Sequence, residues 1–201
     1  MAARGRPRCF DRTCALEQAM EVFWEHGYEG ASLADLTAAM GIASPSLYSA
    51  FGSKEALFRE SVNHYLQTDG SGIWQALEQE PTARAAVSNL LHASAEAVTL
   101  PNKPTGCFLV LAIANCSPEN AGIQIELRNR RVHLGDLLRL RLDRGIADGD
   151  LPPGTETRAL SSFFMTVQQG MSLQARDGGT RADLLRVADF AMAAWPAPAA
   201  A

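Results

Sequence analysis

The fold is decided by the stretch Ser32-Leu-Ala-Asp-Leu-Thr-Ala-Ala-Met-Gly-Ile-Ala-Ser-Pro-Ser-Leu-Tyr48, which predicts two short helices joined by a tight turn. Its first serine can cap the first helix, and Asp35 adds a carboxylate to the first turn, where the helix dipole favours negative charge. Gly41 stands where a left-handed C-terminal residue is needed. Ser44 then predicts the cap of a second helix, which has Pro45 at its first position. This arrangement is typical of a helix–turn–helix unit, which places its second helix in the major groove of DNA.

The remainder of the chain indicates helices throughout. No segment alternates apolar and polar residues, and glycine and proline separate the stretches of helical period. The sequence therefore predicts an all-α protein of about nine helices, with a three-helix DNA-binding domain over residues 1–65 and a larger helical part over residues 66–201. Expected helices outside the helix–turn–helix cover approximately 11–26, 81–101, 107–115, 118–148, 155–174 and 181–195, and a further one, capped by Ser53, runs through Tyr65. The segment 107–115 has almost no polar face, so we expect it to be buried on all sides.

The net charge of −4 does not exclude a nucleic-acid partner, because the positions of the basic residues matter more than the total. Arginines gather in the first twelve residues, where Asp11 is the one acidic residue. They form a basic arm over residues 1–10, from which Arg4 and Arg6 can enter a minor groove, as basic N-terminal arms do. The alternative is a solvated tail that makes no contact with DNA.

Hydroxyl groups dominate the second helix of the helix–turn–helix. The candidate DNA contacts there are Ser44, Ser46, Tyr48 and Ser49. Hydroxyls bond well to phosphate oxygens and only weakly specify bases. This helix lacks the Arg, Lys, Asn and Gln side chains that read bases through paired hydrogen bonds. We therefore expect the register on DNA to come from phosphate contacts, from Lys54 and from the arginine arm.

Neither a membrane nor a metal is an expected partner. The longest purely apolar run, 107–114, is far shorter than the roughly 20 residues of a membrane-spanning helix. The N-terminal arginines have no apolar core after them, so they do not form a secretory signal. The four histidines form no paired motif, so we expect no metal site and no cofactor. These features predict a cytoplasmic protein.

The four cysteines leave two interpretations open. Cys9, Cys14, Cys107 and Cys116 form no CxxC pair and have no histidine at metal-ligand spacing. Reduced, structural thiols are one interpretation. The other is a redox or soft-metal sensor that uses Cys9 and Cys14, or a buried Cys107.

The larger helical part contains residues that could line an apolar pocket. The apolar candidates are Trp74, Phe108, Leu111, Phe163 and Met171, and the polar candidates are His92, Asn115 and Gln168. A mainly apolar site with a few polar groups suits a small hydrophobic or aromatic effector. The alternative for each of these residues is ordinary core packing.

The last two expected helices each carry an apolar stripe at spacings of three and four. The candidate interface residues are Leu160, Phe164, Val167, Leu184, Ala188, Ala191 and Met192. Two such helices, with Gly170 and several alanines permitting close approach, suit an isologous helix-on-helix interface between two copies of the chain. The alternative is packing within one chain.

The N-terminal motifs together resemble a known family. The run 15–28, the helix–turn–helix, and Tyr48-Ser-Ala-Phe-Gly-Ser-Lys54-Glu-Ala-Leu57 resemble the N-terminal domain of TetR/AcrR-type transcriptional regulators. The resemblance implies an all-helical homodimer with a variable ligand-binding and dimerisation domain over 66–201, whose last two helices form a four-helix interface. It also implies that Ser32, Tyr48 and Lys54 contact the DNA backbone. The serine-rich second helix departs from the family pattern in its base-reading positions.

These observations favour a ligand-responsive repressor. It would bind a palindromic operator as a homodimer, with half-sites about 34–36 Å apart, and a small hydrophobic effector would release it. A thiol-switched DNA-binding regulator is the alternative. An enzyme in a helical scaffold would need a nucleophile–base pair, paired carboxylates or a metal set. None of these occurs at local spacing, so we do not expect an enzyme.

Overall fold

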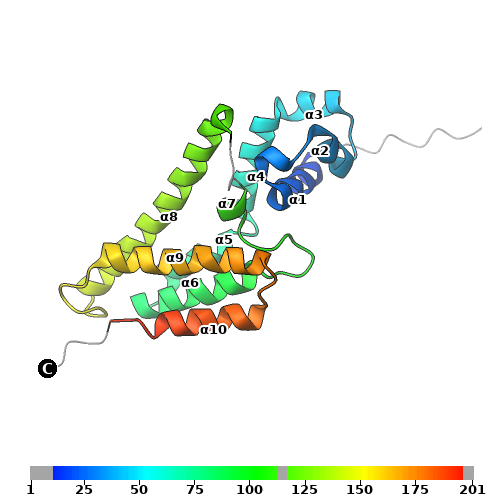
Figure 1. The fold of residues 1–201 in the computed structure, drawn as a ribbon. Coiled ribbons are helices and arrows are strands. Elements are labelled where there is room, and N and C mark those ends of the chain that lie inside the picture. The colour runs from blue at the N-terminus through cyan, green and yellow to red at the C-terminus, as the bar shows by residue number, and fades with distance from the viewer. Residues whose placement is uncertain (1–10, 113–116, 197–201) are drawn as a thin grey trace, which may run out of the picture.

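The computed structural model describes residues 11–112 and 117–196, and every regular element in those ranges is helical. The order of the elements confirms the all-α prediction (Figure 1). The elements are α1 (Arg12–Gly30), α2 (Leu33–Met40), α3 (Ser44–Phe51), α4 (Lys54–Gln67), α5 (Ser71–Gln79), α6 (Ala83–Ala97), α7 (Phe108–Leu111), the 3₁₀ turn η1 (Pro118–Asn120), α8 (Ala121–Ala147), α9 (Thr157–Arg176) and α10 (Arg181–Met192).

The boundaries of α1 and α2 follow from local hydrogen bonds. Asp11 caps α1, since its carboxylate accepts from the backbone N–H groups of Thr13 and Cys14. Ser32 and Asp35 form a capping box at the start of α2, in which each side chain accepts from the other residue's backbone N–H. Gly41 ends α2 in the left-handed conformation, with φ 63° and ψ 30°. The features of α2 match the sequence prediction, whereas α1 continues to Gly30, past the expected end at residue 26, with Gly27 in a non-helical conformation inside it.

The start of α3 differs from the prediction. Ser44 is the first helical residue, and Ala43 occupies the capping position without a side-chain hydrogen bond. The prediction that Ser44 caps this helix is therefore wrong. The helix begins one residue earlier because the Ala43 carbonyl already accepts from the N–H groups of Ser46 and Leu47. Pro45 is still tolerated in the first turn, where a missing N–H costs no helical bond.

The segment around α7 also differs from the prediction. The expected helix over 107–115 is a single turn over Phe108–Leu111 in the described residues, and 113–116 lie outside them. Phe108 and Leu109 are buried, whereas Val110 and Leu111 are only half-buried. The turn is tied to α1 by a backbone hydrogen bond, in which the Ala112 carbonyl accepts from the N–H of Tyr28 at 2.9 Å. Gly27, with φ 72°, permits that approach, because a Cβ there would lie 3.0 Å from the same carbonyl oxygen.

One aromatic cluster joins the two predicted domains. Phe58 and Tyr65 of α4 both pack edge-on against Phe108 of α7, with ring centroids 5.6 Å apart in each pair. Trp24 of α1 packs against Tyr65 at 4.9 Å, and Phe23 packs against Phe58 at 5.1 Å. The core is therefore continuous across the predicted boundary at residue 65.

The C-terminal helices form the larger part of the molecule. In Figure 1, α6, α9 and α10 lie alongside one another, and α8 rises from the end of this group towards α4. Apolar side chains from all three grouped helices form their shared core, among them Leu90, Leu91, Phe164, Leu184 and Ala188. None of the helices in the described ranges has the length and apolar character needed to cross a membrane.

Candidate functional site

The outward face of α3 carries the hydroxyl groups expected there. Ser44, Ser46, Tyr48 and Ser49 are all exposed, and Tyr48 is 46% exposed. On the opposite face, Leu47 is fully buried and holds the helix against the N-terminal core. A single buried side therefore leaves the polar side of α3 free to meet another molecule.

Ser32 and Lys54 stand at the beginning of the two helices that flank α3 in the chain. Ser32 is exposed, and its hydroxyl donates to Asp35 at 2.5 Å. The hydrogen bonds from Ser32 lower the pKa of Asp35 below its ordinary value. The Lys54 ammonium lies 4.6 Å from the centre of the Tyr28 ring. Partial burial lowers the pKa of Lys54, and the nearby charge of Glu29 opposes this effect.

Arg12 is held against the helix–turn–helix. Its guanidinium lies 4.4 Å from the centre of the Phe51 ring, forms an ion pair with Glu60 and donates to the Ala50 carbonyl at 3.3 Å. It borders a surface hollow that Ser46 and Ser49 also line. The sequence placed Arg12 in the basic cluster but did not reveal these contacts, because Glu60 is 48 residues away. Arg4 and Arg6 fall outside the described residues, so their minor-groove role stays a prediction.

A small, mainly apolar cavity of about 20 Å³ lies between α4, α5, α7, α8 and α9. Of the predicted pocket residues, Trp74 and Gln168 line it. The other lining residues are Tyr65, Leu66, Gly70, Ile73, Cys107, Leu109, Val110, Arg131, Leu134, Met165 and Gln169. Tyr65 and Leu66 belong to α4, the helix that directly follows the helix–turn–helix. The cavity therefore adjoins an element that reaches the candidate DNA-binding face.

Of the remaining pocket candidates, those that the structure describes do not line this cavity. Phe108 and Met171 are buried in the core, and Leu111 packs close to Gly106. His92 contacts Asp189 of α10 at 3.0 Å on the surface, and Phe163 is 42% exposed. Asn115 is not among the described residues. Helical spacing identified one face of each helix, but the neighbouring helix that covers this face depends on tertiary packing.

Cys107 is the cysteine that lines the cavity. The Tyr65 hydroxyl donates to its sulfur at 3.4 Å. Burial raises the pKa of the Cys107 thiol, while the Tyr65 hydrogen bond and the nearby Arg131 charge act in the opposite direction. Cys14 is exposed on α1, and Cys9 and Cys116 lie outside the described residues. In the part of the chain that is described, no cluster of His, Cys, Asp and Glu could hold a metal ion.

The predicted interface residues are mostly internal. Phe164, Leu184 and Ala188 are completely buried within one chain, and Ala191 and Met192 are nearly so. They therefore contribute to the core of one chain, and their role at a dimer interface stays a prediction. α9 and α10 each carry apolar side chains on more than one side. The stripe that recurs at spacings of three and four packs mainly inside the chain.

Three apolar side chains on the last two helices point outward instead. Phe163 and Leu173 of α9 are 42% and 55% exposed, and Phe190 of α10 is 79% exposed. Leu160 and Val167, which the sequence also predicted at the interface, are half-buried on α9. The outward faces of α9 and α10 therefore keep an apolar surface, although it consists mainly of residues that the prediction omitted.

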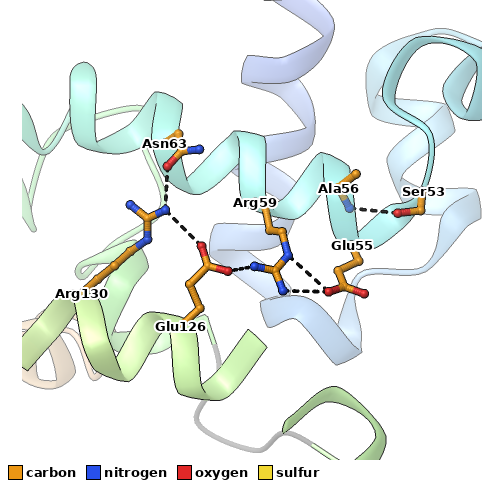
Figure 2. A network of polar contacts seen from close by, with 7 residues as sticks. All are labelled: Ser53, Glu55, Ala56, Arg59, Asn63, Glu126 and Arg130. Carbon is orange, nitrogen blue, oxygen red and sulfur yellow. Dashed lines mark hydrogen bonds and ion pairs between the residues drawn. The ribbon is translucent and has the colours of Figure 1, made fainter. Parts of the chain in front are cut away.

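A network of charged groups connects α4 with α8 (Figure 2). The Glu126 carboxylate of α8 lies between two arginines and pairs with both Arg59 of α4 and Arg130 of α8. Arg130 also donates to Asn63 of α4 at 2.7 Å, and Arg59 donates to Glu55 at 2.8 Å. The network ties the helix that follows α3 to the long helix of the C-terminal part.

Comparisons with known proteins agree with this geometry. Residues 15–61 match the family model described as bacterial regulatory proteins, tetR family. The chain is 35% identical to the HTH-type transcriptional repressor ComR of Escherichia coli strain K12, over 96% of this chain and 93% of that protein. It is 26% identical to the repressor BdcR of the same organism, over 93% of this chain and 90% of BdcR.

A solved structure provides a second comparison. The TetR family transcriptional regulator CifR, as a cysteine mutant complexed with 26-base-pair operator DNA, is 47% identical to this chain. The match covers 96% of this chain and 100% of that one, with a TM-score of 0.91. The similarity therefore extends over both the N-terminal unit and the larger helical part.

Proposed function

Because the chain belongs to the TetR family of bacterial transcriptional regulators, which are not enzymes, we propose that it is a repressor. In this proposal it binds a palindromic operator as a homodimer, and a small effector releases it. The observation that carries the proposal is the outward face of α3, where Tyr48 and three serines are exposed opposite a buried Leu47. CifR, which is similar along its whole length, was solved with operator DNA.

Phosphate contacts supply most of the affinity in this proposal. Ser44, Ser46 and Ser49 of α3 bond to phosphate oxygens together with Tyr48, and Ser32 and Lys54 add contacts from the starts of α2 and α4. The positive ends of these two helix dipoles favour the same anions. In addition, Arg4 and Arg6 reach the adjacent minor groove.

Dimerisation is proposed through the outward faces of α9 and α10. Phe163, Leu173 and Phe190 expose a large apolar area that a second copy would cover. An isologous contact between these helices places the two α3 helices at half-sites about 34–36 Å apart, which requires a palindromic operator.

The effector is proposed to act through α4. This helix begins at Lys54, immediately after α3, and its other end forms a wall of the cavity through Tyr65 and Leu66. A ligand that widens the cavity displaces this end of α4 and thereby tilts α3 relative to the rest of the dimer. A coupling of about 1–3 kcal/mol, equivalent to roughly 5–150-fold in operator affinity, is typical of such linkage.

Selection from a random duplex pool tests the function as a whole. We expect the full-length protein to enrich a palindromic sequence and to bind it, in fluorescence anisotropy at physiological salt, far more tightly than unselected duplexes. Tyr48→Ala should weaken this binding, whereas Leu100→Ala, at a site 40% exposed in the loop after α6, should not. Equal affinity for selected and unselected duplexes would refute the proposed function.

A thiol switch remains the second candidate, and the position of Cys107 favours it. Its sulfur lines the cavity and accepts the hydrogen bond of Tyr65, so oxidation would disturb α4 at the place where a ligand would act. The raised pKa of the Cys107 thiol argues for slow oxidation. If Cys107 is the switch, prolonged exposure to peroxide should weaken operator binding by the native protein but not by the Cys107→Ser variant. Binding that peroxide does not alter would exclude this candidate.

A further inference from the structure

An arginine-rich groove runs along α8 and α9, outside the cavity. Its volume is about 420 Å³, and four arginines line it, namely Arg128, Arg131 and Arg139 of α8 and Arg158 of α9. Asp136 is the one acidic side chain among the described residues that line it. The groove therefore has an excess of positive charge, although the chain as a whole is acidic.

Most of this charge is not neutralised by carboxylates of residues 11–112 and 117–196. Arg139 forms ion pairs with Asp143 at 3.2 Å and with Asp136 at 3.9 Å. By contrast, Arg128, Arg131 and Arg158 form no ion pair with any carboxylate of the described residues. Like charges that gather in one groove attract anions and raise their local concentration.

Arg131 connects the groove with the cavity. Together with Met165 and Gln169 it lines both spaces. One guanidinium nitrogen of Arg131 donates to the Leu109 carbonyl at 2.7 Å, which fixes the side chain at the junction. A guanidinium has five N–H donors, so donors remain for a ligand at this place.

Gln168 places a polar side chain on the wall of the cavity. This residue is only 3% exposed and lines the cavity. Its amide carries both a donor and an acceptor, so it can bond a polar group that enters the cavity. The surrounding walls are apolar and include Trp74 and Leu134.

We propose that the groove and the cavity form one binding site for an organic anion with a short apolar tail. The carboxylate or phosphate head binds Arg131 and Arg158 in the groove, since guanidinium groups donate paired hydrogen bonds to such heads. The tail enters beside Trp74 and Gln168 and widens the cavity, which at about 20 Å³ is too small to admit it unchanged. The role of this anion as the effector rests on the proposed function, but the binding site does not.

Calorimetric titration of the full-length protein with octanoate and with octyl phosphate tests the proposal. Octan-1-ol has the same tail without the charge and serves as the matched control ligand. We expect at least one of the two anions to bind about tenfold or more tightly than the alcohol, and salt to weaken only the binding of the anion.

Variants then locate the head group. Arg131→Gln should weaken anion binding by about tenfold or more, and Arg131→Lys should restore part of it. Arg158→Gln should weaken it severalfold; this exposed residue can be changed without risk to the fold. Arg186→Gln, at an exposed position on α10 away from the groove, is the control and should have no effect.

The proposal is overturned if neither anion binds, if octan-1-ol binds as tightly as both anions, or if Arg158→Gln and Arg131→Gln both leave anion binding unchanged. Operator affinity without any ligand is measured separately by anisotropy. A failure there counts against the repressor function and not against the anion site. Anion binding that leaves operator affinity unaltered would confirm the site and refute its role in release.

Discussion

Glu126 of α8 pairs with Arg59 of α4, and this ion pair joins the helix that follows α3 to the longest helix of the C-terminal part (Figure 2). Arg130 pairs with the same carboxylate from the other side, at 3.0 Å. Burial lowers the pKa of Arg130, and the charge of Arg59 lowers it further, so the two arginines depend on the carboxylate between them. The contact is therefore a link between the two parts of the molecule.

Glu126→Gln should destabilise the protein, because it leaves two neighbouring arginines without their shared counter-charge. The expected loss of unfolding free energy is about 1 kcal/mol, since the Arg59 side chain is 41% exposed and solvent screens part of the interaction. Urea denaturation measures the loss. Glu78→Gln, an exposed residue of α5, is the control. Equal stability of the two variants would show that the network contributes nothing.

The capping box at α2 should be visible as a perturbed titration. Hydrogen bonds from Ser32 hold the pKa of Asp35 below its ordinary value of 3.8. A depressed pKa in the folded state contributes stability above the ordinary value and loses it as the pH falls through the lower, folded value. NMR titration of the Asp35 carboxyl should show this low pKa, and Ser32→Ala should raise it. A native pKa at or above 3.8 would contradict the capping geometry.

Lys54→Met should weaken operator binding without changing sequence preference. A lysine that contacts phosphate contributes counterion release, so its loss should reduce the salt dependence of the binding constant by about one unit of slope. Anisotropy titrations over a series of salt concentrations measure this slope. Lys103→Met is the matched control, since Lys103 pairs with Glu21 and Asp69 away from α3. If both variants give the native slope, Lys54 does not contact phosphate.

Phe190→Glu should produce a folded monomer. The ring is 79% exposed in one chain, so a charge there opposes dimerisation with little cost to the monomer. Phe164→Ala should instead destabilise the fold by about 3–5 kcal/mol, since its ring is completely buried. Sedimentation velocity measures the first effect and thermal unfolding the second. Leu140→Glu, at a site 55% exposed on α8, is the control and should leave the dimer intact. A Phe190→Glu protein that is still a dimer would show that the interface lies elsewhere.

The sequence by itself determined the helix–turn–helix, because the interactions that define it are local. The box between Ser32 and Asp35 and the left-handed Gly41 depend on residues only a few positions apart. The same holds for the Ser53 cap of α4, whose hydroxyl accepts from the Ala56 N–H at 3.0 Å. The prediction for Ser44 was wrong by one position, since backbone bonds to Ala43 started the helix earlier.

Only the tertiary structure decided which side of each C-terminal helix faces a neighbour. Phe163 and Phe164 are adjacent in the chain, yet the first is exposed and the second is buried. The pairing of Tyr65 with Cys107 spans 42 residues, and no periodicity within one helix contains that information. Helical spacing indicates that a face is apolar, whereas the packing of other helices determines whether that face becomes core, cavity or surface.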